Sequence, residues 1–303
     1  MQTPLAGLWV PASTPFTADG ALDETRLVSH CRGLLSDGAT GLAVLGTTSE
    51  ANSLTLAERR RVIDALIENG VAADRLLPGT GACAIDDAVD LSRHAAEIGA
   101  AGVLLLPPFY YKNVSDDGLF AFVAAVIDRC RAQVPRILLY HFPAMAAAGW
   151  SNDLVGRLLE AFPGVVVGMK DSSGEAAHTR SVIEAFPGFA VFPGSEMYLL
   201  DAMTWGAAGC ISATANVNAG AIAAAIARWR EADASIRQEK LVAVRKSFAE
   251  FPTVAAVKTL KAAISGDDAW LIVRPPLTAL SAEARSTLLA RPAIAEMLGA
   301  VAG

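Results

Sequence analysis

The chain has 303 residues, of which 53% are hydrophobic and 18% are charged, and its formal net charge is −6. A disordered chain would be poorer in apolar residues and richer in charge, so the composition predicts a folded protein. The acidic balance argues against a general nucleic-acid binder, which needs a clustered basic face. We find no apolar run long enough to predict a membrane span and no secretory signal in residues 1–10, so the cytoplasm is the expected location.

The cysteines predict a reducing environment and no metal. They stand far apart in the sequence, each in an apolar neighbourhood, at Cys31, Cys83, Cys130 and Cys210. There is no C-x-x-C pair and no Cys/His cluster, so we expect no zinc site. We expect four reduced and mostly buried thiols.

Short apolar runs alternate with longer amphipathic segments along most of the chain. Several runs are apolar throughout, as in GVLLLP at 102–107, which is typical of parallel strands buried on both faces. The eight predicted strands are residues 7–13, 41–45, 76–80, 102–106, 136–141, 165–170, 190–193 and 210–213.

Helical patterns lie between these strands, and two of them carry clear start signals. Asp23 is a predicted N-cap, and Thr55 and Glu58 have the spacing of a capping box. The helices predicted between the strands are residues 22–36, 55–69, 86–98, 116–132, 152–162 and 175–186.

This alternation predicts an α/β fold, a (β/α)8 TIM barrel with additional C-terminal helices. We assign residues 1–218 to the barrel and residues 219–303 to a helical extension packed on it, with helices over 219–264 and near 281–298. The main alternative is a doubly wound open sheet, which usually shows a G-x-G-x-x-G turn after its first strand. The segment TPFTADG at 14–20 lacks that turn.

Lys170 is the most informative position, because it ends the predicted strand 165–170. Active sites of such barrels lie at the carboxyl ends of the strands. Desolvation there favours the neutral amine, which can attack a ketone and form an iminium that acts as an electron sink. A lysine that reaches solvent or pairs with Asp171 is the alternative, and position alone does not choose between the two.

Tyr140 ends the fifth predicted strand, where a phenol could move protons for a carbinolamine or a substrate hydroxyl. An ordinary aromatic side chain of the barrel interior is the alternative. His141 follows it and points to the opposite face of the strand, so we expect a structural role for that histidine.

Four loops at the same barrel end have two interpretations each. The turn GTTSE at 46–50 offers N–H groups and hydroxyls to a carboxylate, or it only caps a helix. The loop PPFYYK at 107–112 places two tyrosines at the catalytic face or at an oligomer contact. The segments 194–195 and 209–212 could bind phosphate, or their small residues only allow close backbone approach.

Taken together, these segments resemble the dihydrodipicolinate synthase / N-acetylneuraminate lyase family, the pyruvate-dependent class I aldolases. The spacing holds over roughly the whole chain. The matching pieces are TPF at 14–16, GTTSE at 46–50, PFYY at 108–111, LYHFP at 139–143, VGMKD at 167–171, GCISA at 209–213 leading to Asn216, Lys258, and RPPL at 274–277.

The resemblance implies a role for each matching residue. Lys170 matches the Schiff-base lysine, and Tyr140 matches the tyrosine that relays protons. Thr47 matches the threonine that links this tyrosine to a second tyrosine. Tyr111 matches that second tyrosine, which in the family usually reaches across a subunit interface. The predicted substrate-binding residues are Thr48, which matches a residue holding the pyruvate carboxylate, Ile211, whose carbonyl matches the pocket lining, and Gly194 and Ser195.

The resemblance also implies that the protein needs no metal and no organic cofactor, and that it forms a homotetramer or a homodimer. Its small-molecule partners would be a 2-oxo acid such as pyruvate and an aldehyde, with no nucleic acid and no membrane involved.

Two departures from the family pattern matter. Ser49 stands where the family turn usually has a second glycine, which would cost free energy if that position needs a positive φ. The segment PAMAAAG at 143–149 lacks the arginine that holds the distal carboxylate of the aldehyde in true dihydrodipicolinate synthases. Losing that bidentate partner would cost about 2 kcal/mol or more, which argues against activity in lysine synthesis.

We therefore predict a Schiff-base lyase that cleaves or forms a C–C bond next to pyruvate. The substrate would be a 2-keto-3-deoxy sugar acid or a 4-hydroxy-2-oxo acid. A 2-oxo-acid dehydratase and a 4-hydroxy-tetrahydrodipicolinate synthase are alternatives within the enzymes. The alternative of another class is a regulatory protein that binds pyruvate without turnover.

Overall fold

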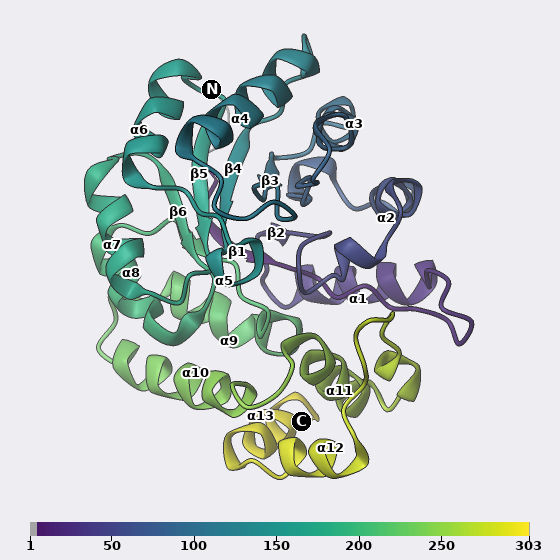
Figure 1. The fold of residues 1–303 in the computed structure, drawn as a ribbon. Helices are drawn as coiled ribbons and strands as arrows, with labels where there is room; N and C mark the ends of the chain where they lie inside the picture. The colour runs from purple at the N-terminus through teal and green to yellow at the C-terminus, as the bar shows by residue number, and fades with distance from the viewer. Residues whose placement is uncertain (1–4, 303) are drawn as a thin grey trace.

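Parallel strands form the wall of a barrel in the computed structural model, which describes residues 5–302 (Figure 1). They form two sheets, in the orders β2-β1-β7 and β3-β4-β5-β6. The strands are β1 (Gly7–Val10), β2 (Gly41–Leu42), β3 (Val103–Leu105), β4 (Ile137–His141), β5 (Val166–Asp171), β6 (Ala190–Pro193) and β7 (Gly209–Cys210).

Two sets of hydrogen bonds close these sheets into one ring. The predicted strand 76–80 pairs with β2 on one side and β3 on the other, through the parallel bridges Leu42–Leu76 and Gly79–Leu104. On the far side, the Ile211 amide donates to the Pro193 carbonyl at 3.1 Å and so joins β7 to β6. The predicted (β/α)8 barrel is confirmed, although its third strand makes only isolated bridges.

Some strands are shorter than predicted. Regular pairing of the segment 41–45 ends at Leu42, and Leu45 has a left-handed backbone with φ of 62°. A left-handed residue turns the chain out of the extended path, so the segment exits the barrel early. The eighth predicted strand, 210–213, is observed only as Gly209–Cys210.

The predicted helix starts are confirmed. The Asp23 side chain accepts a hydrogen bond from the Arg26 amide at the start of α1 (Glu24–Ser36). Thr55 and Glu58 form a capping box on α2 (Leu56–Glu68). The other helices around the barrel are α3 (Ile85–Glu97), α4 (Asp116–Cys130), α5 (Pro143–Ala146), α6 (Asn152–Ala161), α7 (Ala176–Ala185), α8 (Leu199–Trp205) and α9 (Ala215–Ala227).

The last part of the chain forms helices that gather beside α1 and α9 (Figure 1). They are α10 (Ala234–Phe248), α11 (Thr253–Ser265), α12 (Ala282–Leu289) and α13 (Pro292–Ala302). The helix expected near 281–298 is divided by the turn before Pro292. The division of the chain at residues 218 and 219 stays a prediction, and α9 spans that boundary.

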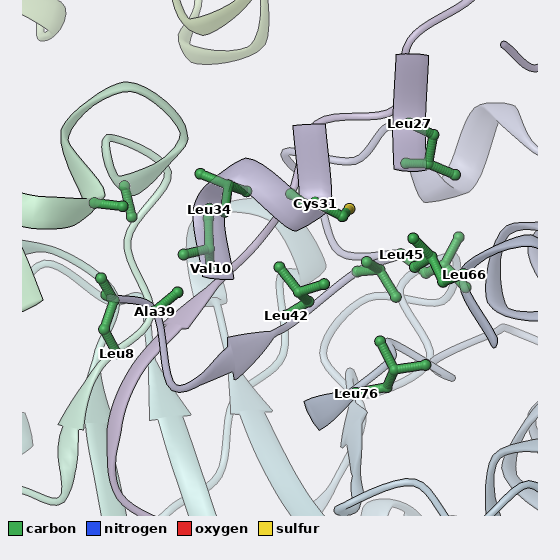
Figure 2. Close-up of a cluster of buried hydrophobic side chains, with 14 of the residues drawn as sticks. Leu8, Val10, Leu27, Cys31, Leu34, Ala39, Leu42, Leu45, Leu66 and Leu76 are labelled. Carbon is green, nitrogen blue, oxygen red and sulfur yellow. The ribbon is translucent and has the colours of Figure 1, made fainter. Parts of the chain in front are cut away.

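Buried aliphatic side chains fix the strands against the surrounding helices. Leu8, Val10 and Leu42 of the barrel wall belong to one buried hydrophobic cluster with Leu27 and Leu34 of α1, and Figure 2 shows Leu34 close to Val10. Close packing of this kind resists displacement, so the strand ends keep their positions.

Of the cysteines, Cys31, Cys130 and Cys210 are buried and Cys83 is exposed. No helix within residues 5–302 has both the length and the apolar character needed to cross a bilayer.

Candidate active site at the carboxyl ends of the strands

Lys170 and Tyr140 lie side by side at the carboxyl ends of β5 and β4. The two residues are partners in the parallel register. The Lys170 side chain is buried, since the residue is only 4% exposed, and its Nζ lies 4.2 Å from the centroid of the Tyr140 ring. An amine held against an aromatic face and shielded from water can meet a carbonyl carbon without first shedding a hydration shell.

Thr47 lies next to this pair. Its Oγ1 is 3.3 Å from the hydroxyl of Tyr140, so a proton can pass between the two groups. Thr48 is buried beside it. The structure therefore brings together Lys170, Tyr140 and Thr47, which come from two strand ends and one turn, and Thr48 follows Thr47 in that turn.

Ser49 fits its position without the backbone cost that we considered. The left-handed conformation falls on the next residue, Glu50, with φ of 56°. Ser49 is fully buried, and its hydroxyl donates to the Ala12 carbonyl at 2.6 Å. Its own carbonyl accepts a hydrogen bond from the Thr14 hydroxyl at 2.7 Å. The serine thus ties the turn 46–50 to the segment that follows β1.

A buried ion pair holds the end of the same turn. The ammonium of Lys258, on α11, contacts the carboxylate of Glu50, and both side chains are shielded from solvent. Lys258 also donates to the Ile272 carbonyl at 2.7 Å, and the Arg274 amide donates to Glu50 at 2.9 Å. Burial lowers the pKa of Lys258, while the charge of Glu50 opposes that shift. No sequence motif predicts that Glu50 pairs with Lys258, because the two residues lie far apart along the chain.

A second polar network lies on the other face of β4 and β5. The Trp150 amide donates to Nδ1 of His141 at 3.0 Å, and the rings of His141 and His178 stack with centroids 4.2 Å apart. Nδ1 of His178 lies 2.9 Å from a carboxylate oxygen of Asp171, which also accepts from the Thr179 hydroxyl at 2.6 Å. His141 therefore has the structural role that the alternation of the strand predicted.

The electrostatics of this network follow from burial and hydrogen bonding. Burial acts to raise the pKa of Asp171, but hydrogen bonds from His178, Thr179 and Ser173 outweigh it and lower that pKa to about 2. Burial lowers the pKa of His141 to about 4, and the neighbouring His178 adds to the effect. His141, Asp171 and His178 are residue types that bind metals and their ligand atoms lie close together, but each already makes a hydrogen bond inside the network.

The other residues predicted to bind substrate lie in the segments after β6 and β7. Ile211 is fully buried, and its amide bonds to β6. The Gly194 amide donates to the Asp171 carbonyl at 2.6 Å, and a Cβ at Gly194 would collide with Ser172. The Ser195 hydroxyl accepts from the Met197 amide at 3.3 Å and caps a short 3-10 helix. Close backbone approach is therefore a sufficient reason for the glycine.

Tyr111 lies apart from the other predicted residues. It is 73% exposed, and its ring packs edge-on against Tyr110 with centroids 5.3 Å apart. Within residues 5–302, no hydrogen bond joins it to Thr47 or Tyr140. An exposed pair of large aromatic rings is typical of a protein–protein contact.

The segment 143–149 forms the short helix α5 and a left-handed turn at Ala147, where φ is 49°. Met145 is its most exposed large side chain, at 58%. The segment carries no charged side chain, so it offers no cation to a carboxylate.

A closed barrel with a buried lysine and a tyrosine at its carboxyl strand ends has the architecture of a barrel enzyme. The chain belongs to the dihydrodipicolinate synthetase family, whose model matches residues 4–292. The predicted resemblance is therefore confirmed.

Individual relatives agree with this family membership. The chain is 32% identical over 281 residues to an uncharacterized DapA-like lyase of Chloroflexus aurantiacus, covering 91% of this chain and 92% of the relative. It is similar to the crystal structure of dihydrodipicolinate synthase from Agrobacterium tumefaciens, with a TM-score of 0.90 and 35% identity over 96% of this chain and 99% of that one.

A third relative was solved with a small molecule. YagE of Escherichia coli, a family member in complex with pyruvate, matches with a TM-score of 0.88 and 27% identity over 97% of this chain and 99% of that one. Family members are lyases and aldolases, so the chain is assigned to the enzymes.

Proposed function

We propose that the protein is a class I lyase in which Lys170 forms a Schiff base with pyruvate or a related 2-oxo acid. The observation that carries this proposal is the placement of Lys170. Its buried Nζ lies against Tyr140, whose hydroxyl contacts Thr47. The relative in complex with pyruvate supports the substrate class.

In the proposed reaction, the Lys170 amine attacks the ketone, and loss of water gives an iminium. Tyr140 gives and takes the protons of the carbinolamine, and Thr47 passes them on. Tyr140 then takes the proton of the substrate's C4 hydroxyl, the C3–C4 bond breaks, and the iminium at C2 accepts its electron pair, so the substrate splits into an aldehyde and the enamine of pyruvate. Protonation of the enamine and hydrolysis then release pyruvate.

Thr48 is proposed to hold the carboxylate of the 2-oxo acid. The other residues proposed to line the substrate pocket are Ile211, Gly194 and Ser195. Tyr111 is proposed to complete the proton relay of a neighbouring subunit in a homodimer or homotetramer. Its exposure in the single chain supports this role. The same enamine could expel a hydroxyl instead of an aldehyde, so a dehydratase is the second candidate.

Trapping the Schiff base tests the proposal. Incubation with pyruvate and borohydride should add the mass of pyruvic acid less one oxygen atom, because the imine loses water and then gains hydride and a proton. Lys170→Met should abolish this adduct, whereas Lys246→Met, which changes an exposed lysine on α10, should keep it. Failure of the folded wild-type protein to form the adduct would instead favour a regulatory protein without this chemistry.

The uncharged segment 143–149 supports a distal substrate group without a carboxylate. We expect aspartate semialdehyde to react with a kcat/KM lower by about 30-fold or more than that of an uncharged aldehyde of similar size. Met145→Arg should narrow this difference, because it returns a cation to the segment. Rapid turnover of aspartate semialdehyde by the wild type would restore the 4-hydroxy-tetrahydrodipicolinate synthase alternative.

A further inference from the structure

His178, in the first turn of α7, contacts the residues that follow both members of the proposed catalytic pair. Tyr140 and Lys170 are partners in the register of β4 and β5, and His141 and Asp171 are the next partners. Side chains alternate along a strand, so His141 and Asp171 point to the outer face of the barrel wall, where α7 lies (Figure 1). One side chain outside the wall therefore touches both strands that carry the catalytic pair on the inside.

The first contact of His178 is with Asp171. Nδ1 of His178 lies 2.9 Å from a carboxylate oxygen of Asp171, and the Thr179 hydroxyl and the Ser173 amide are the other donors to this carboxylate. The Asp171 carboxylate is fully buried, whereas the His178 side chain is 21% exposed and separates it from the solvent. A buried carboxylate that loses a hydrogen-bond donor is stabilised by turning toward water. The N–H of His178 therefore helps to hold the carboxylate, and with it the end of β5, in place.

The second contact of His178 is with His141, on β4. The two imidazole rings stack with centroids 4.2 Å apart and an angle of 13° between their planes. The His141 ring is itself held, because the Trp150 amide donates to its Nδ1 at 3.0 Å and the backbone at Gly149 lies so close that a Cβ there would be 2.7 Å from its Cε1. His178 therefore joins the end of β5 to a ring that keeps its position on β4.

This bridge stands where the two strands end, at His141 and Asp171. Backbone hydrogen bonds still join the strands here, such as that from the Ser172 amide to the His141 carbonyl at 2.7 Å, but such bonds tolerate a range of strand twist. Twisting a strand end moves its inward side chain together with its outward one. The Lys170 Nζ lies on a flexible four-carbon stem, 4.2 Å from the centroid of the Tyr140 ring. A displacement of about 1 Å can slow a reaction by about 100-fold.

We propose that His178 is a positioning residue for the Schiff-base reaction. By linking Asp171 to His141 on the outer face of the wall, it sets the spacing between Lys170 and Tyr140 on the inner face. His178 acts through the two strands and does not itself take part in bond making. This inference rests on the proposed function of Lys170.

Two variants separate the two contacts of His178. His178→Phe keeps a flat ring against His141 but has no N–H for Asp171. His178→Asn lacks the stacked ring, but it places an amide N–H close to the position of Nδ1 and so can still donate to Asp171. Arg180→Met, which changes an exposed side chain two residues further along α7, is the control.

The measurement is the rate of adduct formation with pyruvate, stopped with borohydride at increasing times and at several pyruvate concentrations. At saturating pyruvate, we expect His178→Phe to be slower than the wild type by about 10-fold or more, because the amine and Tyr140 lose their spacing. The pyruvate concentration that gives half the maximal rate should change by less than about 3-fold, because Thr48, which is proposed to bind the carboxylate, lies on a different turn. His178→Asn should stay within about 3-fold of the wild-type rate at saturation, and Arg180→Met should match the wild type.

A merely structural role of His178 predicts a different result. Partial unfolding of His178→Phe would lower the final amount of adduct, while the rate constant of the folded molecules would stay near that of the wild type. The inference would be overturned by a His178→Phe rate constant equal to that of the wild type, by an effect confined to the half-saturating pyruvate concentration, or by equal slowing in His178→Asn. Wild-type protein that forms no adduct at all would instead overturn the proposed function of Lys170, and this inference with it.

Discussion

The buried pair of Lys258 and Glu50 should be the most sensitive ion pair that we describe. Both side chains are shielded from solvent, and the remaining Glu50 oxygen is already engaged by the Arg274 amide. Lys258→Met therefore leaves the Glu50 carboxylate buried without the ammonium that contacts it. Removing one partner of such a pair costs about 3–5 kcal/mol of unfolding free energy. At about 2 °C per kcal/mol for a chain of this size, Tm should fall by roughly 6–10 °C.

A double-mutant cycle isolates this effect. Glu50→Gln keeps an acceptor for the Arg274 amide while it removes the charge, so the double variant should be more stable than Lys258→Met alone. Urea denaturation at one fixed protein concentration measures the four free energies, since subunit association also contributes to stability.

An exposed pair provides the matched control. Arg180 and Glu184 lie 2.7 Å apart on α7 with side chains 55% and 57% exposed, so Arg180→Met should cost less than about 1 kcal/mol. The reasoning would be refuted if Lys258→Met lowered the unfolding free energy no more than Arg180→Met does. It would also be refuted if the effects of Lys258→Met and Glu50→Gln on the unfolding free energy were strictly additive.

Three further outcomes are expected. Thr47→Val should slow borohydride trapping of pyruvate by about 100-fold, since it removes one member of the proton relay. Gly149→Ala should lower the unfolding free energy by about 1–3 kcal/mol in urea, because its Cβ would lie 2.7 Å from Cε1 of His141. The hydrogen bond that the His178 ring donates to the Asp171 carboxylate raises the pKa of His178, so the stability it adds is complete below about pH 6.5 and is lost as the pH rises through the raised value. The difference in unfolding free energy between wild type and His178→Gln should therefore shrink above about pH 6.5, and a constant difference would count against this account.

The barrel could be predicted because its strands are apolar on both faces and its helices carry local start signals. The run 76–80 was identified by its apolar residues even though its backbone makes only isolated bridges. The predicted strands are too long, because the chain leaves the barrel at Leu45 through a left-handed backbone conformation that a leucine does not predict.

The candidate site, like the barrel, could be predicted only in part. Lys170 and Tyr140 follow from their positions at strand ends, since adjacent parallel strands deliver their last residues to one place. The contacts that hold the turn 46–50 were not predictable, because Lys258 approaches Glu50 only after α11 has packed on the barrel. Ser49 could not be judged from its residue type either, since the position of the left-handed residue in the turn decides its cost.

Trp150, which follows the segment 143–149, links that segment to the strand that carries Tyr140 of the proposed proton relay. The Trp150 indole donates to the Tyr140 carbonyl at 3.1 Å, and the Trp150 amide donates to His141. A change in the length of this segment would therefore pull on β4, and the hydroxyl of Tyr140 would move away from Thr47. The preference for the aldehyde can therefore be altered without losing the contact between Tyr140 and Thr47 only through side chains that do not take part in these hydrogen bonds. Met145 is such a position because it is exposed, so Met145→Arg should change the preferred aldehyde while the rate of pyruvate trapping stays near that of the wild type.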